Sequence, residues 1–259
     1  MSHVEWRKLR ADQLRELAKQ NAIVIVPVAS MEQHGPHLPV EVDTVLGEEI
    51  AARTARKIVA AGQAAVTLPA VWTGISEHHM SFGGTISLEA AELSALMGGV
   101  VRSIVRHGFK RIAILNSHGG NENALRAIVD DFTPRFGLPI VQFTYWYPAA
   151  PAIAKILETQ GGLTHACEAE TSMMMAARPD LVATDRIPRG RSNVSHEVGG
   201  GIYRWRDIGS RSETGAMGNP EAATAEKGER LFEAVSETLA TKLADADLWS
   251  ARWRTEPMR

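Results

Sequence analysis

Five side chains that can bind a metal ion or move a proton lie close together near the N-terminus. They are Glu32, His34, His37, Glu41 and Asp43. Glu32 and His34 are two residues apart, so in an extended chain both side chains project to the same side. Imidazole and carboxylate groups together suit zinc, manganese or iron. A polar turn at the start of a helix would have the same composition, so this stretch alone leaves both interpretations open.

A second candidate group follows the apolar run at 111–116. His118 precedes two glycines, and Glu122 stands four residues after it. Gly119 and Gly120 can adopt positive φ and let the backbone approach a ligand closely. A phosphate-binding loop does not fit, because no lysine follows the glycines. The alternative is a glycine-rich turn that begins a helix.

A third group combines His165, Glu168 and Glu170 with a methionine-rich run. A carboxylate beside such a run is costly to bury unless it is paired or bound to a metal. Acidic residues are also favoured at the N-terminus of a helix by its dipole, which is the simpler explanation. Cys167 is interpreted as a packing residue, because a Cys–His nucleophile would leave the neighbouring acids unexplained.

Two histidines and a tryptophan could also contact a substrate. His78 lies beside His79 in a loop after an apolar run, and Trp146 follows another apolar run. A polar surface loop and a core aromatic residue are the simpler alternatives.

These groups need elements that bring them together. Strands are predicted at 22–28, 64–71, 111–116 and 138–145, and helices at 44–61, 87–107, 122–132, 170–177 and 219–246. Ser87 is the expected N-cap of its helix, and Pro220 fits the first turn of the last one. The alternation predicts a single α/β domain over residues 1–259 with a mostly parallel sheet.

Ligands of open α/β sheets bind beyond the carboxyl ends of the strands. All three groups follow or adjoin such ends, so we expect them to converge there. One metal ion needs three or four ligands, whereas five or six, with an aspartate able to bridge, suggest two ions that share a water molecule.

The composition excludes several classes of protein. Of the 259 residues, 44% are hydrophobic and 22% charged, which is ordinary for a globular protein. A net charge of −2 argues against binding nucleic acid by phosphate neutralisation. A single cysteine excludes an internal disulfide. Without an apolar leader or a run long enough to cross a bilayer, we expect a cytoplasmic protein that acts on a small molecule and binds no membrane.

The loose stretch 187–218 could hold a hairpin or a lid.

Several motifs, in this order, resemble the creatininase (creatinine amidohydrolase) family over most of the chain. They are residues 32–39 with Asp43, residues 83–88, 116–121, 170–172 and 218–220, and residues 223–228. The resemblance implies a three-layer α/β/α fold, a two-metal hydrolase that acts on carbon–nitrogen bonds, and a homohexamer.

Carried over by motif, Glu32 and His118 would hold one metal ion, His34 the other, and Asp43 would bridge them. Creatininase itself has a tyrosine and a metal-binding glutamate directly after its motif histidine, where this chain has two glycines. We expect Glu170 to supply the missing ligand, with Glu122 as the alternative.

A tryptophan of the creatinine pocket is also absent, since Gly161 stands at its place. The chain is therefore not expected to be creatininase itself. Other family branches resemble a deformylase and a peptide-trimming enzyme.

The function expected from sequence is hydrolysis of a small amide, cyclic or a formamide, with two divalent ions of Zn, Mn or Fe. The ions lower the pKa of a shared water molecule and polarise the carbonyl. His165 would carry the proton to the leaving nitrogen, and His78 and Trp146 would contact the substrate. The alternatives are a lactonase or a peptidase with the same ions, or a metal-binding protein without turnover.

Overall fold

The centre of the molecule is a sheet of four parallel strands. The computed structural model describes residues 3–189, 202 and 204–250. Within them the strands are β1 (Ile23–Val28), β2 (Ala65–Thr67), β3 (Arg111–Asn116) and β4 (Ile140–Thr144). Their order across the sheet is β2-β1-β3-β4, so β1 pairs with both β2 and β3. The predicted α/β class with a parallel sheet is confirmed.

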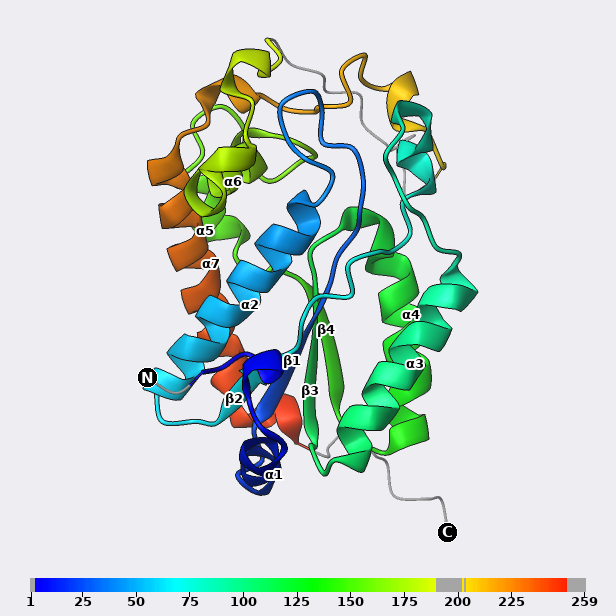
Figure 1. The fold of residues 1–259 in the computed structure, drawn as a ribbon, viewed down its shortest axis with the longest axis vertical. Helices are drawn as coiled ribbons and strands as arrows, with labels where there is room; N and C mark the ends of the chain where they lie inside the picture. Colours follow the sequence, from blue (N-terminus) through cyan, green and yellow to red (C-terminus); the bar gives the residue numbers. More distant parts are fainter. Residues whose placement is uncertain (1–2, 190–201, 203, 251–259) are drawn as a thin grey trace.

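Helices cover both faces of this sheet (Figure 1). On one face lie α3 (Ala90–Arg106) and α4 (Glu122–Phe136), and on the other lie α2 (Val42–Ala60), α5 (Ala150–Ala154), α6 (Glu168–Ala177) and α7 (Ala225–Ala244). Alternate residues of β1 belong to different clusters: Ile23 and Ile25 pack with α2, α6 and α7, whereas Val24 and Val26 pack with α3 and α4. This alternation explains why β1 is apolar throughout, and it gives the three layers that the family resemblance implies.

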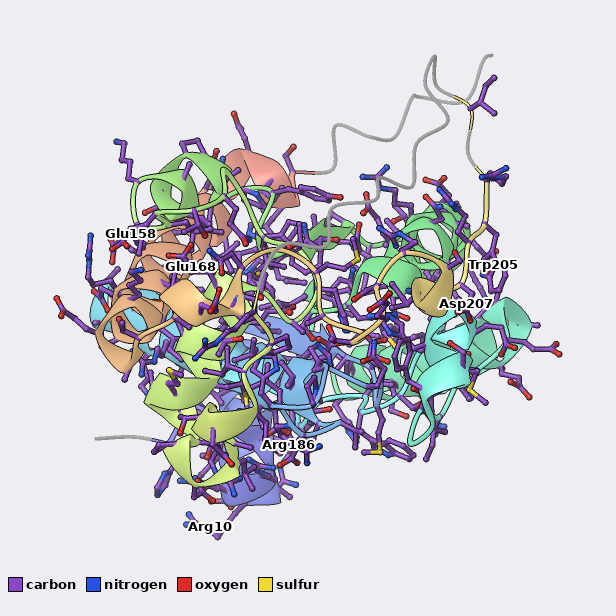
Figure 2. All side chains as sticks on the ribbon, turned by 90° about the horizontal axis from the view of Figure 1, so that it is seen from above. Arg10, Glu158, Glu168, Arg186, Trp205 and Asp207 are labelled. Carbon is purple, nitrogen blue, oxygen red and sulfur yellow. The ribbon has the colours of Figure 1, made fainter. Side chains whose placement is uncertain are left out.

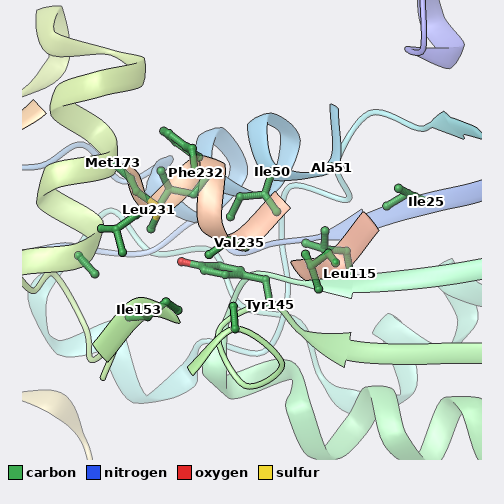
Figure 3. Packing of buried hydrophobic residues seen from close by; sticks show 14 of the residues in the cluster. Ile25, Ile50, Ala51, Leu115, Tyr145, Ile153, Met173, Leu231, Phe232 and Val235 are labelled. Atoms are coloured by element: carbon green, nitrogen blue, oxygen red, sulfur yellow. The ribbon is translucent and has the colours of Figure 1, made fainter. Parts of the chain in front are cut away.

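Tyr145, directly after β4, lies in the larger of these clusters. Its ring packs near Leu115, Ile153 and Val235 (Figure 3). The side chain is completely buried, and its hydroxyl has no hydrogen-bond partner among the described residues. Burial raises the pKa of Tyr145 well above its usual value, so the phenol stays neutral.

Helix α1 (Ala11–Lys19) and several short 3₁₀ turns complete the described chain. The turns are Trp6–Lys8, Glu77–Phe82, Gly119–Asn121, Pro179–Leu181, Thr184–Arg186, Ile208–Ser210, Pro220–Ala222 and Ala246–Trp249. Neither α1 nor α5 is predicted from sequence, because both are short and lie outside the strand–helix alternation.

Some predicted boundaries are wrong. Helix α3 begins after Glu89, whose backbone N–H donates to the Glu92 side chain over 2.8 Å. The predicted cap, Ser87, instead accepts a hydrogen bond from the backbone of Ser76. Pro220 starts a separate turn, and α7 begins after Thr224, whose hydroxyl accepts from the Lys227 backbone N–H.

Residues 187–218 lie partly outside the described residues. The described portion contains the turn Ile208–Ser210 and no hairpin. Among the helices that the structure describes, none has the length and apolar character needed to cross a membrane.

Candidate metal centre

The five predicted metal ligands meet beyond the carboxyl ends of β1 and β3. Each is at most 4% exposed; they are Glu32, His34, Asp43, His118 and Glu170. The first two follow β1, Asp43 lies in the first turn of α2, His118 follows β3, and Glu170 lies in the first turn of α6. The convergence expected from the strand order is therefore present.

Glu32, Asp43 and His118 form one group. His118 Nδ1 lies 3.1 Å from Glu32 Oε2 and 3.2 Å from Asp43 Oδ2. Each residue offers a possible ligand atom, and these atoms all lie within 4.8 Å of one another.

His34, Asp43 and Glu170 form a second group of the same size. His34 Nε2 lies 3.4 Å from Asp43 Oδ1 and 3.8 Å from Glu170 Oε2. Asp43 thus belongs to both groups, with one carboxylate oxygen facing each histidine.

The remaining ring nitrogen of each histidine is held by a backbone carbonyl. His118 Nε2 donates to Ile75 O over 2.9 Å, and His34 Nδ1 donates to Glu32 O over 3.1 Å. The proton of each neutral ring is therefore on the outer nitrogen, and the lone pair faces the carboxylates. Metal-binding histidines are oriented in this way.

Two buried atoms support the fit to metal ions. His34 Nε2 and Asp43 Oδ2 make no hydrogen bond of acceptable geometry within the described part of the chain. Buried polar atoms almost always have a partner. Nitrogen and oxygen donors aimed at one another in a buried space are the donor set that Zn, Mn or Fe would take.

The metal-free centre holds protons. Burial would lower the pKa of His34, but Asp43 and Glu170 outweigh it and raise this pKa to about 9. Burial likewise opposes protonation of His118, yet Glu32 and Asp43 raise its pKa well above the usual value. Burial raises the pKa of Glu170 to about 8. A metal ion must displace these protons in order to bind.

Two serines hold Glu32. Ser30 Oγ donates to Glu32 Oε2 over 3.0 Å and Ser76 Oγ donates to the same oxygen over 2.8 Å. Neither serine is a sequence candidate. Ser30 is close to Glu32 in the chain, but Ser76 arrives from the connection after β2, which no local motif indicates.

His165, the predicted proton carrier, lies at the edge of the centre. Its Nδ1 is 3.4 Å from Glu32 Oε1, and with Glu32 and His34 it forms a third possible ligand group. His79 Nε2 is 3.3 Å from the same Glu32 oxygen. From sequence, His79 is only a possible substrate contact beside His78. In the structure it is buried against Glu32, and burial lowers its pKa to about 2.

The alternative ligand, Glu122, is absent from the possible ligand groups of the described residues. Its carboxylate accepts a hydrogen bond from Tyr147 Oη over 2.9 Å and pairs with Arg126. The other polar residues of the first stretch also lie elsewhere: His37 Nε2 bonds to Thr171 Oγ1 over 2.9 Å, and Glu41 is 3.9 Å from Arg178.

Glu168 forms a buried ion pair. Lys227 Nζ, from α7, donates to Glu168 Oε1 over 2.8 Å, and the backbone N–H groups of Glu158 and Thr159 donate to the same carboxylate. Glu158 and Glu168 lie together at one side of the molecule, and Trp205 lies at the opposite side (Figure 2). The ion pair between Glu168 and Lys227 joins α7 to the start of α6, three residues after His165.

A pocket of about 610 Å³ opens onto the centre. His78, Trp146 and His165 line it, as do Glu32, Asp43 and Glu170. His78 stacks on His118 with ring centroids 5.6 Å apart. Both predicted substrate contacts are therefore placed in the pocket wall. Residues 205–217 add Trp205, Arg206, Ile208, Arg211 and Met217, which no sequence motif indicates.

Comparisons with known proteins give a consistent result. A family model described as creatininase, creatinine amidohydrolase, matches residues 7–243. The chain is 34% identical over 225 residues to a mycofactocin precursor peptide peptidase of Mycolicibacterium smegmatis, covering 84% of this chain and 83% of that protein. It is 26% identical over 272 residues to a creatinine amidohydrolase of Pseudomonas putida, covering 95% and 96% of the two. A solved structure of creatininase, described as its Mn form, has a TM-score of 0.80 at 24% identity and covers 93% of this chain and 97% of that one.

Proposed function

The chain belongs to the creatininase family of hydrolases, and we propose that it binds two divalent metal ions and hydrolyses the carbon–nitrogen bond of a small amide. The position of Asp43 is the main support for this proposal. Its Oδ1 faces His34 and its Oδ2 faces His118, so one carboxylate is shared between two buried ligand groups. Glu32 and His118 complete one group, and His34 and Glu170 complete the other.

Bound at such a centre, two divalent ions of Zn, Mn or Fe supply an activated water molecule and polarise the substrate carbonyl. His165 lies beside Glu32 at the pocket wall, where it can carry a proton to the leaving nitrogen. Addition of water across the bond gives a carboxylic acid and an amine. His78 and Trp146 would orient the substrate.

The proposed substrate is a cyclic amide or a small formamide. A pocket of this size, with the centre at its buried end, holds a small molecule. Gly119 and Gly120 replace the residues expected in creatininase, so the substrate need not be creatinine.

Metal content per subunit tests the two-ion centre. We would measure it in native protein purified without added metal and in Glu170→Gln. The expected result is about two equivalents in the native protein and about one in the variant, because only one group of ligands uses Glu170. Glu122→Gln is the matched control and should keep both.

One equivalent in the native protein and in Glu170→Gln would contradict the two-ion proposal. Two equivalents in Glu170→Gln together with one in Glu122→Gln would assign the last ligand to Glu122 instead.

A peptidase is the second candidate, because a relative with 34% identity is named a peptide peptidase. Liquid chromatography of reactions with a panel of cyclic amides, formamides, lactones and short linear peptides would separate the candidates. Cleavage of linear peptides alone would favour the peptidase. No turnover of any member by metal-loaded protein would favour a metal-binding role without catalysis.

We also propose that residues 1–259 form one domain of a cytoplasmic homohexamer. The family model, which spans most of the chain, supports the single domain, and the location and the hexamer follow the expectations from sequence and family resemblance. Light scattering of the purified protein would give the number of subunits.

A further inference from the structure

Gln33 stands between two metal ligands in the sequence, and its side chain connects two histidines. Gln33 Nε2 lies 2.8 Å from His79 Nδ1 and 3.0 Å from His165 Nε2. The glutamine is 7% exposed. Its amide is therefore part of the buried wall that surrounds Glu32.

Two backbone groups fix the orientation of this amide. Gly35 N–H donates to Gln33 Oε1 over 2.9 Å, and Gln33 Nε2 lies 3.2 Å from the carbonyl oxygen of Gly215. If the amide were flipped, its NH₂ group would face the Gly35 N–H and its oxygen would face the Gly215 oxygen. Both contacts would be repulsive, so the NH₂ group must face the histidines.

The NH₂ group can only donate hydrogen bonds. Each histidine nitrogen that faces it must therefore carry a lone pair, since an N–H at that distance would oppose another N–H. His165 then carries its proton on Nδ1, whereas His79 carries its proton on Nε2. Both of these N–H groups face Glu32 Oε1, at 3.4 and 3.3 Å.

We propose that Gln33 is a positioning residue that holds His165 and His79 in opposite tautomers, so that His165 presents an N–H to the centre instead of a lone pair. His165 then donates a hydrogen bond to the centre and is not a metal ligand. Of the three possible ligand groups, the one that contains His165 is excluded, and the two that share Asp43 remain. The value of this N–H for catalysis rests on the proposed function, but the tautomers do not.

Gly215 allows this arrangement. It has φ of +80°, and a Cβ at this position would collide with Gln33 Oε1. A glycine is needed for the backbone to pass so close to the amide. The connection before α7 therefore closes directly over Gln33.

The test is a ¹⁵N NMR spectrum of metal-free protein labelled with ¹⁵N-histidine, with His165 and His79 assigned from the His165→Asn and His79→Asn variants. The native protein should show a protonated Nδ1 in His165 and a protonated Nε2 in His79. Gln33→Met should lose both preferences. Gln63→Met, which removes a glutamine bonded to Ala244 and Arg111, is the control and should leave both tautomers unchanged.

Gln33→Glu gives the sharpest result, because a carboxylate accepts hydrogen bonds where the amide donates them. His165 Nε2 and His79 Nδ1 should both become protonated, a change that a merely structural role of Gln33 would not produce. The proposal is overturned if native His165 is protonated on Nε2, or if Gln33→Met and Gln33→Glu leave the native tautomers in place.

Metal content of the same preparations separates the two proposals. Native protein with one metal ion and the stated tautomers would refute the two-ion centre and retain the role of Gln33. Two ions with the opposite tautomers would support the two-ion centre and refute the role of Gln33.

Discussion

The carbonyl oxygen of Ile75 occupies the space into which a side chain at Gly120 would project. A Cβ at this position would collide with that oxygen and with His118 Nε2. The same carbonyl accepts the hydrogen bond that orients His118. The Ile75 carbonyl therefore both requires glycine at position 120 and orients His118. A glutamate at this position, as the resemblance to creatininase would require, has no room here.

Gly120→Ala should therefore damage the centre. Because the obstacle is backbone, the chain must shift, at a cost of about 1–3 kcal/mol in the free energy of unfolding. Metal content should fall as His118 loses its carbonyl partner. Urea unfolding and elemental analysis measure the two effects.

Gly119→Ala is the matched control for this variant. A Cβ on Gly119 would meet no atom within 4 Å, so stability and metal content should stay close to native. Equal behaviour of the two alanine variants would contradict the role assigned to Ile75.

Metal binding should release protons and strengthen with rising pH. His34 and Glu170 have pKa values of about 9 and about 8 in the metal-free protein, and the pKa of His118 is also raised. Below these values the groups are protonated, and a metal ion must displace about three protons at neutral pH. Affinity should therefore rise from pH 7 to pH 9.

Titration calorimetry with Zn²⁺ in buffers of different ionisation enthalpy measures this release. In Glu170→Gln, which should bind only one ion, the protons of both Glu170 and His34 should be missing from the release. A release close to zero at pH 7 would show that the centre is already deprotonated.

His165→Ala should separate amide from lactone hydrolysis. An amine leaving group needs a proton, whereas the oxygen leaving group of a lactone needs less help. For a matched cyclic amide and lactone that the native enzyme turns over, kcat for the amide should fall about 10²–10⁴-fold. The lactone rate should fall much less.

Metal content of His165→Ala serves as the control, because a histidine that is not a ligand leaves it unchanged. An equal loss of rate on both substrates would argue against proton transfer to the leaving group.

Lys227→Met should destabilise the protein although it lies outside the pocket. The variant leaves Glu168, which is completely buried, without its cation. Loss of one partner of a buried pair costs about 3–5 kcal/mol. The double variant Lys227→Met with Glu168→Gln should recover part of this loss in urea unfolding, because the glutamine is uncharged and its oxygen can still accept from the backbone N–H and the hydroxyl of Thr159.

The strand–helix alternation and the motifs predict the fold and the gathering of Glu32, His34 and His118, because these residues directly follow strands that the sequence marks clearly. Bringing Glu170 rather than Glu122 to the centre depends on how α6 docks, which no local pattern specifies. The metal-binding roles of Glu32, His34, Asp43, His118 and Glu170 remain predictions.

The contacts of Ser76 and His79 with Glu32 are missed for the same reason: both residues lie on an irregular connection whose path is set by tertiary contacts. Asn121 illustrates this, since its side chain bonds to the backbone of both Ile75 and Ala29. Gln33 is missed because nothing in the sequence distinguishes it from a spacer between two ligands.

The ion pair between Glu168 and Lys227 has a consequence for the order in which the protein matures. All five proposed ligands have been synthesised once the ribosome passes residue 170, but Lys227 follows 57 residues later (227 − 170). A nascent chain that docked α6 early would bury the Glu168 carboxylate without its cation. The proposed metal centre is therefore expected to close only after translation is nearly finished.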